Sequence, residues 1–168
     1  GIGVVTTAAK ADLVSKETLD YSFQLMTTLN KSARDAMVKY RVHACTDVTG
    51  FGLLGHGTEM AQGSNVELHL HVEGFRFLDE AAELARMGIL PEGMYRNRNF
   101  AEAHVDEGDV PLHLQDLLYD PQTAGGLLIA VHPEDAQALF EELQTCVPAA
   151  QRIGEVAPYT GGKHIYLH

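Results

Sequence analysis

Apolar side chains recur at every third or fourth position in several segments of the chain, which is the period of a helix with one buried face. The first of these segments predicts a helix over residues 16–29, whose buried face is formed by Leu19, Phe23, Met26 and Leu29. The same period predicts four later helices. They lie within residues 32–40, 53–62, 78–85 and 133–143.

Strands are predicted where this period is absent. Residues 66–72 alternate apolar and polar side chains, as a strand with one buried face does. Residues 127–131 form an apolar run, which is consistent with a strand buried on both faces. The remaining strands are expected through Val4 and Val5, over 42–48, and over 151–156 and 163–167 with a turn at Gly161 and Gly162 between them.

The segment from Leu90 to Val110 carries scattered proline, glycine and asparagine residues, and we expect it to be irregular. The other predicted elements alternate between helices and strands, which favours an α/β fold layered on a mixed sheet. A chain of 168 residues buries roughly 70% of the surface that its unfolded form exposes. A single domain over residues 1–168 therefore needs no disulfide framework.

Charge and composition exclude several classes of function. The 12 basic and 23 acidic residues give a net charge of −11 at pH 7, which repels nucleic-acid backbones and anionic lipids. No apolar run approaches the ~20 residues of a membrane span. With only two cysteines, these features predict a cytoplasmic protein that binds neither nucleic acid nor membrane. Because the chain begins at Gly1 rather than at a methionine, we expect it to be part of a longer protein.

The sharpest chemical signal is the segment Thr46-Asp47-Val48-Thr49-Gly50-Phe51-Gly52, which lies where a predicted strand ends and a helix begins. This is where α/β proteins bind ligands. The glycines let the backbone approach a ligand closely, and the helix start presents amides to a phosphate. The carboxylate of Asp47 could hold Mg²⁺ through oxygen. Alternatively Asp47 only caps the turn, and the residues alone leave the two hypotheses equally open.

Three glycines of this region also match the dinucleotide pattern G-x-G-x-x-G, namely Gly50, Gly52 and Gly55, with Glu73 where a ribose-binding acid is expected. That motif normally follows a buried apolar strand that opens the domain. Here polar residues precede the glycines and two predicted helices precede the strand, so this alternative is the weaker one.

A second motif, Asp120-Pro121-Gln122-Thr123-Ala124-Gly125-Gly126, precedes the apolar strand at 127–131. Pro121 fixes its own φ and restrains Asp120. The polar side chains can bind a ligand or a facing domain, but the residues favour a shaped turn that satisfies its own backbone.

The nine histidines form no recognisable zinc pattern. His69 and His71 share one strand face, and so do His43 and Cys45, but neither pair has the usual number of ligands. We interpret both faces as solvated and Cys146 as a small buried hydrophobe.

Taken together, the motifs from Thr46 to His56 and from Asp120 to Leu128 closely resemble the C-terminal half of selenophosphate synthetase (selenide, water dikinase). Further matches, which extend the resemblance over essentially the whole chain, occur at Gly3–Lys10, Gly93, Arg96-Asn97 and Ile153–Glu155. Ala124 departs from the pattern, because the family usually has serine there. This difference puts a required hydroxyl in doubt, but not the fold.

The resemblance implies a three-layer α/β/α unit, the C-terminal domain of the aminoimidazole-ribonucleotide synthetase superfamily. It implies that Asp47 binds a Mg²⁺ ion that bridges to the phosphates of ATP, and that Thr49, Gly50 and Gly52 belong to the ATP-binding loop. It also implies an N-terminal domain, absent from residues 1–168, that carries the catalytic cysteine or selenocysteine, its lysine and most ATP contacts. No catalytic residue is therefore expected in this chain.

The whole protein, by this resemblance, would be a homodimer that converts selenide, ATP and water into selenophosphate, AMP and phosphate, and this part alone would be inactive. Two other interpretations stay open. A sister synthetase acting on a purine or hydrogenase-maturation substrate shares the fold, although Phe51 and the Asp120–Thr123 run favour selenium. A noncatalytic binding module would not need Asp47 or the glycine run.

Overall fold

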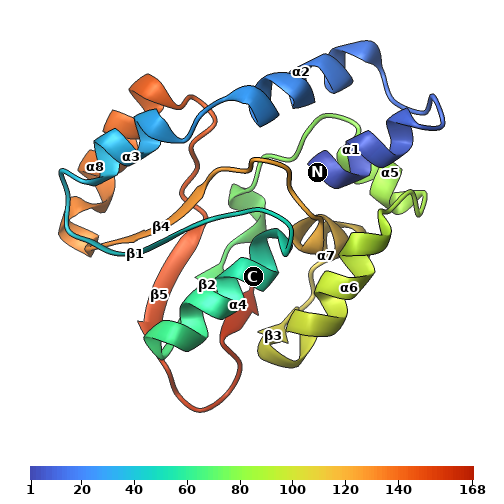
Figure 1. The fold of residues 1–168 in the computed structure, drawn as a ribbon. Coiled ribbons are helices and arrows are strands. Elements are labelled where there is room, and N and C mark those ends of the chain that lie inside the picture. Colours follow the sequence, from blue (N-terminus) through green and yellow to red (C-terminus); the bar gives the residue numbers. More distant parts are fainter.

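A computed structural model describes residues 1–168 (Figure 1). Its helices are α1 (Ile2–Ala9), α2 (Lys16–Thr27), α3 (Lys31–Met37), α4 (Gly52–Ser64), α5 (Ala81–Arg86), α6 (Glu92–Ala101), α7 (Leu112–Tyr119) and α8 (Pro133–Cys146). Its strands are β1 (Val42–Asp47), β2 (Val66–Leu70), β3 (Val105–Asp106), β4 (Leu127–Val131), β5 (Gly154–Pro158) and β6 (Ile165–Leu167). Two 3₁₀ turns, η1 (Val72–Gly74) and η2 (Glu102–His104), complete the order.

The predicted α/β fold with a mixed sheet is confirmed, and its strands form two separate sheets. β1 and β4 pair antiparallel as a two-stranded ribbon. The other strands form a sheet in the order β3-β6-β2-β5, in which β2 is antiparallel to β5 and parallel to β6. The two closing strands are confirmed near their predicted positions, but they lie on opposite sides of β2 and do not form a hairpin.

The main hydrophobic core lies between the four-stranded sheet and helices α4, α6 and α7. It contains Leu54, Ala61, Leu68, Leu70, Val72, Met94, Ala101, Val105, Leu118, Tyr119, Ile165 and Leu167. A smaller core joins α1, α5 and α7. In Figure 1 the β1–β4 ribbon extends from these helices towards α3 and α8, which pack on each other at its far end.

The strand predicted through Val4 and Val5 is wrong, because both residues belong to helix α1. Their side chains, with that of Ala8, are completely buried against Ala81 and Leu84. Packing of this apolar face against α5 outweighs the preference of valine for strands. Residues 4, 5 and 8 lie on one side of a helix, a spacing that the short segment shows only weakly.

The irregular segment predicted between Leu90 and Val110 is also wrong, since it contains α6 and β3. Only Met94, Asn97 and Ala101 of α6 are buried, and their spacing of three and four is helical. The buried position in the middle is occupied by a polar side chain, so the apolar period was too weak to recognise. Helix α7, which follows Pro111, was not predicted either.

Helix α2 confirms the first predicted helix but not its buried face. Thr18 and Ser22 are buried, whereas Phe23 is 49% and Leu29 is 78% exposed. The polar side of α2 faces the domain because the Thr18 hydroxyl bonds to Glu80 at the start of α5, 2.6 Å away. Two other burial predictions are wrong: β4 is only half-buried, since it pairs with β1 alone, and Cys146 is exposed.

Candidate functional site

Asp47 is the last residue of β1, at the strand end where the sequence predicted it. Residues alternate along β1, so that His43, Cys45 and Asp47 share its exposed side. No hydrogen bond or ion pair engages the Asp47 carboxylate, while Val48 continues the ribbon by donating its amide to Gly126 O. The structure has no group of three histidine, cysteine or acidic side chains that could hold a metal ion. Asp47 is therefore a single free carboxylate, which fits an ion whose other ligands come from elsewhere.

Gly52 determines the shape of the loop after Asp47. Its φ is +68°, a left-handed conformation that costs other residues free energy. A Cβ atom at this position would lie 2.6 Å from Tyr119 O, so the close approach of the second motif also requires glycine. By contrast, Gly50 is exposed and has open space around it.

The hydroxyl of Thr49 and the amide of Phe51 both point to the imidazole of His56, one turn into α4. Thr49 Oγ1 lies 3.1 Å and Phe51 N lies 3.4 Å from His56 Nε2. Because an amide can only donate, Nε2 accepts and the proton lies on Nδ1, which is 3.2 Å from Glu59 Oε2. The amide of Gly52 is bonded to Thr49 O. Within this loop, Gly50 thus offers the most accessible backbone.

The second motif interlocks with the first. The backbone amide of Gln122 donates to Thr49 O at 3.0 Å. Gly125 approaches the first motif so closely that a Cβ atom there would lie 2.0 Å from Val48 O. The side-chain amide of Asn97, from α6, donates to Gly50 O at 2.8 Å and to Tyr119 O at 2.9 Å. One buried side chain therefore holds both motifs, although they are about 70 residues apart in the sequence.

Asp120 has a structural environment that the sequence did not reveal. Its side chain is completely buried, and Oδ2 accepts hydrogen bonds from Gly3 N at 2.8 Å and Gln122 Nε2 at 2.9 Å. Oδ1 has no hydrogen-bond partner. Burial raises the pKa of this carboxyl above its usual value. Gln122 Nε2 also donates to Asp120 O within the turn, at 2.8 Å, but Asp120 itself binds the first turn of α1, so the turn does more than satisfy its own backbone as the sequence favoured.

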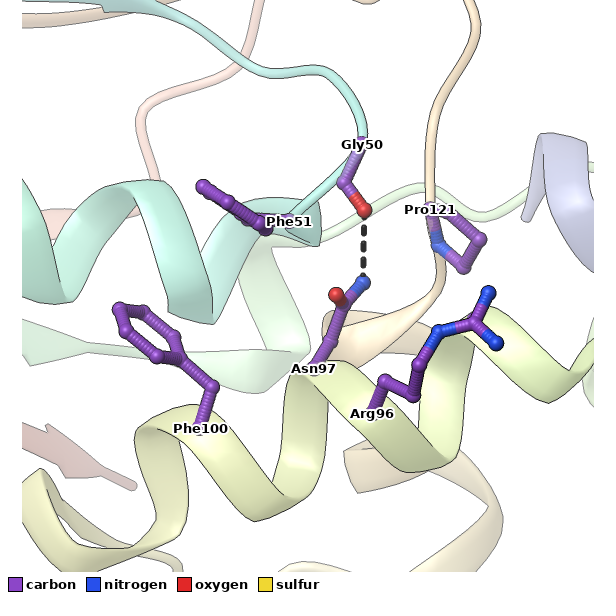
Figure 2. Close-up of a pocket in the computed structure, with 7 residues that line it drawn as sticks. Gly50, Phe51, Arg96, Asn97, Phe100 and Pro121 are labelled. Atoms are coloured by element: carbon purple, nitrogen blue, oxygen red, sulfur yellow. Dashed lines mark hydrogen bonds between the residues drawn. The ribbon is translucent and has the colours of Figure 1, made fainter.

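A pocket of about 520 Å³ lies beside these two loops (Figure 2). It is lined by Gly50, Phe51, Gly93, Arg96, Asn97, Phe100 and Pro121. In Figure 2 the hydrogen bond from Asn97 to Gly50 lies between the two phenylalanines on one side and the Arg96 guanidinium, near Pro121, on the other. The pocket joins residues of both motifs to α6.

Asp47 ends β1, Thr49 and Gly50 lie in the loop that follows, and Gly52 begins α4; the second motif packs against this segment. Of the α6 residues, Arg96 and Asn97 were noticed only as part of the family resemblance, and Phe100 was missed. The dinucleotide alternative fails, because β1 lies in an antiparallel ribbon rather than in a parallel sheet.

The fold and this loop pair define a mixed α/β domain with a candidate ligand site at a strand end. Residues 1–166 match the family described as "AIR synthase related protein, C-terminal domain". The chain belongs to this family.

Several curated relatives are similar over most of the chain. A selenide, water dikinase of Treponema denticola is 49% identical over 143 residues, which are 85% of this chain and 40% of the relative. Selenide, water dikinase 2 of Peptoclostridium acidaminophilum is 46% identical over 91% of this chain and 44% of its own length. A selenide, water dikinase of Clostridioides difficile is 41% identical over 98% of this chain and 48% of its own length. The chain therefore spans less than half the length of these relatives.

A solved structure supports the fold. The crystal structure of thiamine-monophosphate kinase from Stenotrophomonas maltophilia K279a superimposes with a TM-score of 0.50 over 99% of this chain and 46% of its own. At 14% sequence identity, this likeness concerns the fold alone. No helix in the present structure combines the length and apolar character needed to cross a membrane.

Proposed function

We propose that this chain is the part of a cytoplasmic selenide, water dikinase that supplies one Mg²⁺ ligand and one wall of the ATP site. Asp47 holds the ion, and the loop with Thr49, Gly50 and Gly52 faces the phosphates of ATP. The observation that carries the proposal is the Asp47 carboxylate, which no protein group engages although it ends a strand beside a glycine loop. The relatives are selenide, water dikinases, and this supports the reaction class.

Mg²⁺ in such sites is usually held by one or two carboxylates together with substrate phosphates. When bound, the ion neutralises charge that develops during phosphoryl transfer. The tasks of this chain are then to place one carboxylate and to hold a backbone turn open at Gly50. Gly52 contributes through its conformation, because its amide is already bonded to Thr49 O.

The remaining requirements fall to the half of the protein that this chain does not span. In the proposed reaction, selenide, ATP and water give selenophosphate, AMP and phosphate. The catalytic cysteine or selenocysteine, its lysine and most ATP contacts belong to an N-terminal domain of the same protein, which acts as a homodimer. On this proposal the present chain alone binds Mg²⁺-ATP too weakly for micromolar detection and turns over nothing.

The decisive variant is Asp47→Asn in the complete protein. Loss of a metal ligand is expected to lower selenide-dependent ATP turnover at least about 100-fold. Stability should change little, because the carboxylate is exposed and unpaired. Asp79→Asn is the matched control, an exposed aspartate outside the loop with no ion pair. Retained turnover in Asp47→Asn would remove this residue from the metal site.

Calorimetry of Mg²⁺-ATP binding to this chain tests whether most ATP contacts belong to the N-terminal domain. Absence of heat at micromolar nucleotide supports an incomplete half-site. Clear binding that Asp47→Asn abolishes would show a complete nucleotide site in residues 1–168, contrary to the proposal.

A further inference from the structure

One face of the four-stranded sheet carries a group of imidazoles that the proposed function does not use. Leucine and isoleucine side chains of β2 and β6 fill the main core, so the residues that alternate with them lie on the opposite face. On β2 these are His69 and His71, and at β6 they are Tyr166 and His168. His168 follows β6 directly, and its backbone is fixed by two hydrogen bonds, both 2.9 Å long, to the end of β2 and the residues after it.

The closest contact in this group joins His69 to His168. Nδ1 of His69 lies 3.0 Å from Nε2 of His168, and the two rings are nearly parallel, with centroids 5.3 Å apart. Two imidazole nitrogens on one tetrahedral Zn²⁺ ion lie about 3.3 Å apart, because each Zn–N bond is about 2.0–2.1 Å long. The pair therefore has to widen only slightly, with a rotation of the exposed His168 side chain, to admit such an ion.

Glu67 orients the ring of His69. Its Oε2 lies 3.5 Å from His69 Nε2, and the two side chains are only 5% and 26% exposed. Its Oε1 accepts from the amide and the hydroxyl of Thr160, both at 2.7 Å, and these bonds hold the pKa of the carboxyl below its usual value. The negative charge favours the His69 tautomer with its proton on Nε2, which leaves the lone pair of Nδ1 facing His168. Histidines that bind metals almost always donate their second nitrogen to such a group.

The chemistry of this face selects the kind of ion. Imidazole nitrogens suit Zn²⁺, Ni²⁺ and Cu²⁺, whereas Mg²⁺ prefers oxygen ligands. Glu155 of β5 pairs with His69 and is exposed, so it adds a negative charge beside the two rings. No three histidine, cysteine or acidic side chains form a metal-binding group, and the two imidazoles are thus the only protein ligands in place. Water fills the remaining positions around the ion.

We propose that His69 and His168 form a binding site for a divalent transition-metal ion of the Zn²⁺ class, with Glu67 as its positioning residue. The ion joins β2 to the end of β6 through side chains, so its binding stabilises the four-stranded sheet. The site is independent of the proposed function, because it uses no residue of the Asp47 loop. The sequence placed His69 and His71 on one face but could not reveal this pair, whose members are 99 residues apart.

The test is a calorimetric titration of the chain with Zn²⁺, in an excess of Mg²⁺. We expect saturable binding of one ion per chain, which His69→Gln and His168→Gln each abolish. His43→Gln is the matched control, because His43 is an exposed strand histidine whose ring lies 5.8 Å from that of His132 without a hydrogen bond between them. Absence of saturable binding, binding retained in His168→Gln, or binding lost in His43→Gln would overturn the proposal.

Unfolding in urea gives a second measurement of the same site. Because a ligand that binds the folded chain stabilises it, Zn²⁺ should raise the urea midpoint of the natural chain and of His43→Gln. The midpoint of His168→Gln should not respond. An equal rise in all three proteins would show that Zn²⁺ acts elsewhere on the chain.

Glu67→Gln tests the positioning residue. It should weaken Zn²⁺ binding about 10–100-fold, the usual effect of losing such a partner. The glutamine amide would donate to His69 Nε2 and move the ring proton to Nδ1, where it blocks the ion. The ¹⁵N chemical shifts of the His69 ring without metal report this tautomer, and circular dichroism checks the fold. An unchanged affinity, or a proton on Nδ1 in the natural chain, would contradict the role of Glu67.

Discussion

Gly52 is the residue of the site loop with the least freedom to change. It combines a φ of +68° with a carbonyl oxygen, that of Tyr119, 2.6 Å from where a Cβ atom would stand. We expect Gly52→Ala to lower the free energy of unfolding by roughly 2–4 kcal/mol, from backbone strain and steric overlap together. Urea denaturation followed by circular dichroism measures this change.

Gly50→Ala provides the comparison, because the space around Gly50 is open and its φ is not left-handed. Its effect should stay below about 1 kcal/mol. An equal loss of stability in both variants would contradict this argument. It would show that the close approach of Tyr119 O does not require glycine at position 52.

At single positions, the sequence indicated where a residue lies along its element better than it indicated that residue's environment. Asp47 lies at the strand end as predicted, since strand and breaker signals are local. The complete burial of Asp120 could not be predicted, because it depends on Gly3 and α1, 117 residues away. Asn97 was noticed only through the family resemblance, and its role could not be predicted for the same reason: its partners, Gly50 O and Tyr119 O, come from other segments of the chain.

Among the elements, the start of β1 is joined to α8 by an ion pair between Arg41, the residue before the strand, and Asp135. The guanidinium contacts both carboxylate oxygens, at 2.9 Å and 2.7 Å, and the Arg41 amide donates to the same carboxylate. These bonds hold the pKa of Asp135 well below its usual value of 3.8. A depressed pKa stabilises the fold above the unfolded value, and this stabilisation is lost as the pH falls towards the folded value.

We therefore expect Asp135→Asn to be less stable than the natural chain at neutral pH, with a difference that is constant above about pH 5. The difference should shrink as the pH falls through 3.8 and below. Urea midpoints between neutral and strongly acidic pH measure it. Arg41→Gln removes the same pair and should show the same convergence. A difference in stability that persists in strong acid would contradict the low pKa assigned to Asp135.

Helix α2 presents the apolar side chains of Tyr21 and Phe23 to solvent, and Leu29, two residues beyond its end, is exposed as well. Exposed apolar groups of this kind favour association. Leu29→Lys should reduce association in sedimentation velocity and change stability by less than about 0.5 kcal/mol. Leu139→Ala, which truncates a buried side chain of α8, should instead cost about 2–5 kcal/mol. A large loss of stability in Leu29→Lys would show that this face packs within the domain.

The same helix shows where periodicity misleads. Its apolar positions repeat as a buried face does, yet the domain buries Thr18 and Ser22. Periodicity reports that a face is apolar, but not which partner covers it. In α6 the reverse holds, because a buried asparagine interrupts the apolar stripe. Helices and strands with regular amphipathic patterns, such as α4, α8 and β2, were found close to their true positions.

For the molecule as a whole, we expect the two-stranded and the four-stranded sheet to differ in the free energy of local opening. The four-stranded sheet contributes Leu68, Leu70, Val105, Ile165 and Leu167 to the main core, whereas no residue of β1 or β4 is fully buried. Regions with few buried contacts open at lower free energy. In native-state hydrogen exchange, we expect the amides of β1 and β4 to exchange before those of β2 and β6. Equal opening free energies would indicate one cooperative unit.

The division of the strands into two sheets could not be predicted from the sequence. Each strand was recognisable from its own residues, but pairing depends on contacts such as Cys45 with Ile129, more than 80 residues apart. The order of the predicted elements already indicated an α/β fold with a mixed sheet, and the family resemblance identified the domain, which the family match confirms.

The order of strands in the sheet has a consequence for how the protein is made. β6 lies between β2 and β3, although both precede it in the chain. During synthesis, β3 has no sheet partner and β2 has only β5 until residues 165–167 have left the ribosome. The edges of β2 and β3 that β6 will cover stay open until then, and open strand edges invite pairing with other chains. Nascent chains stalled before β6 should therefore be the species that most depends on chaperones.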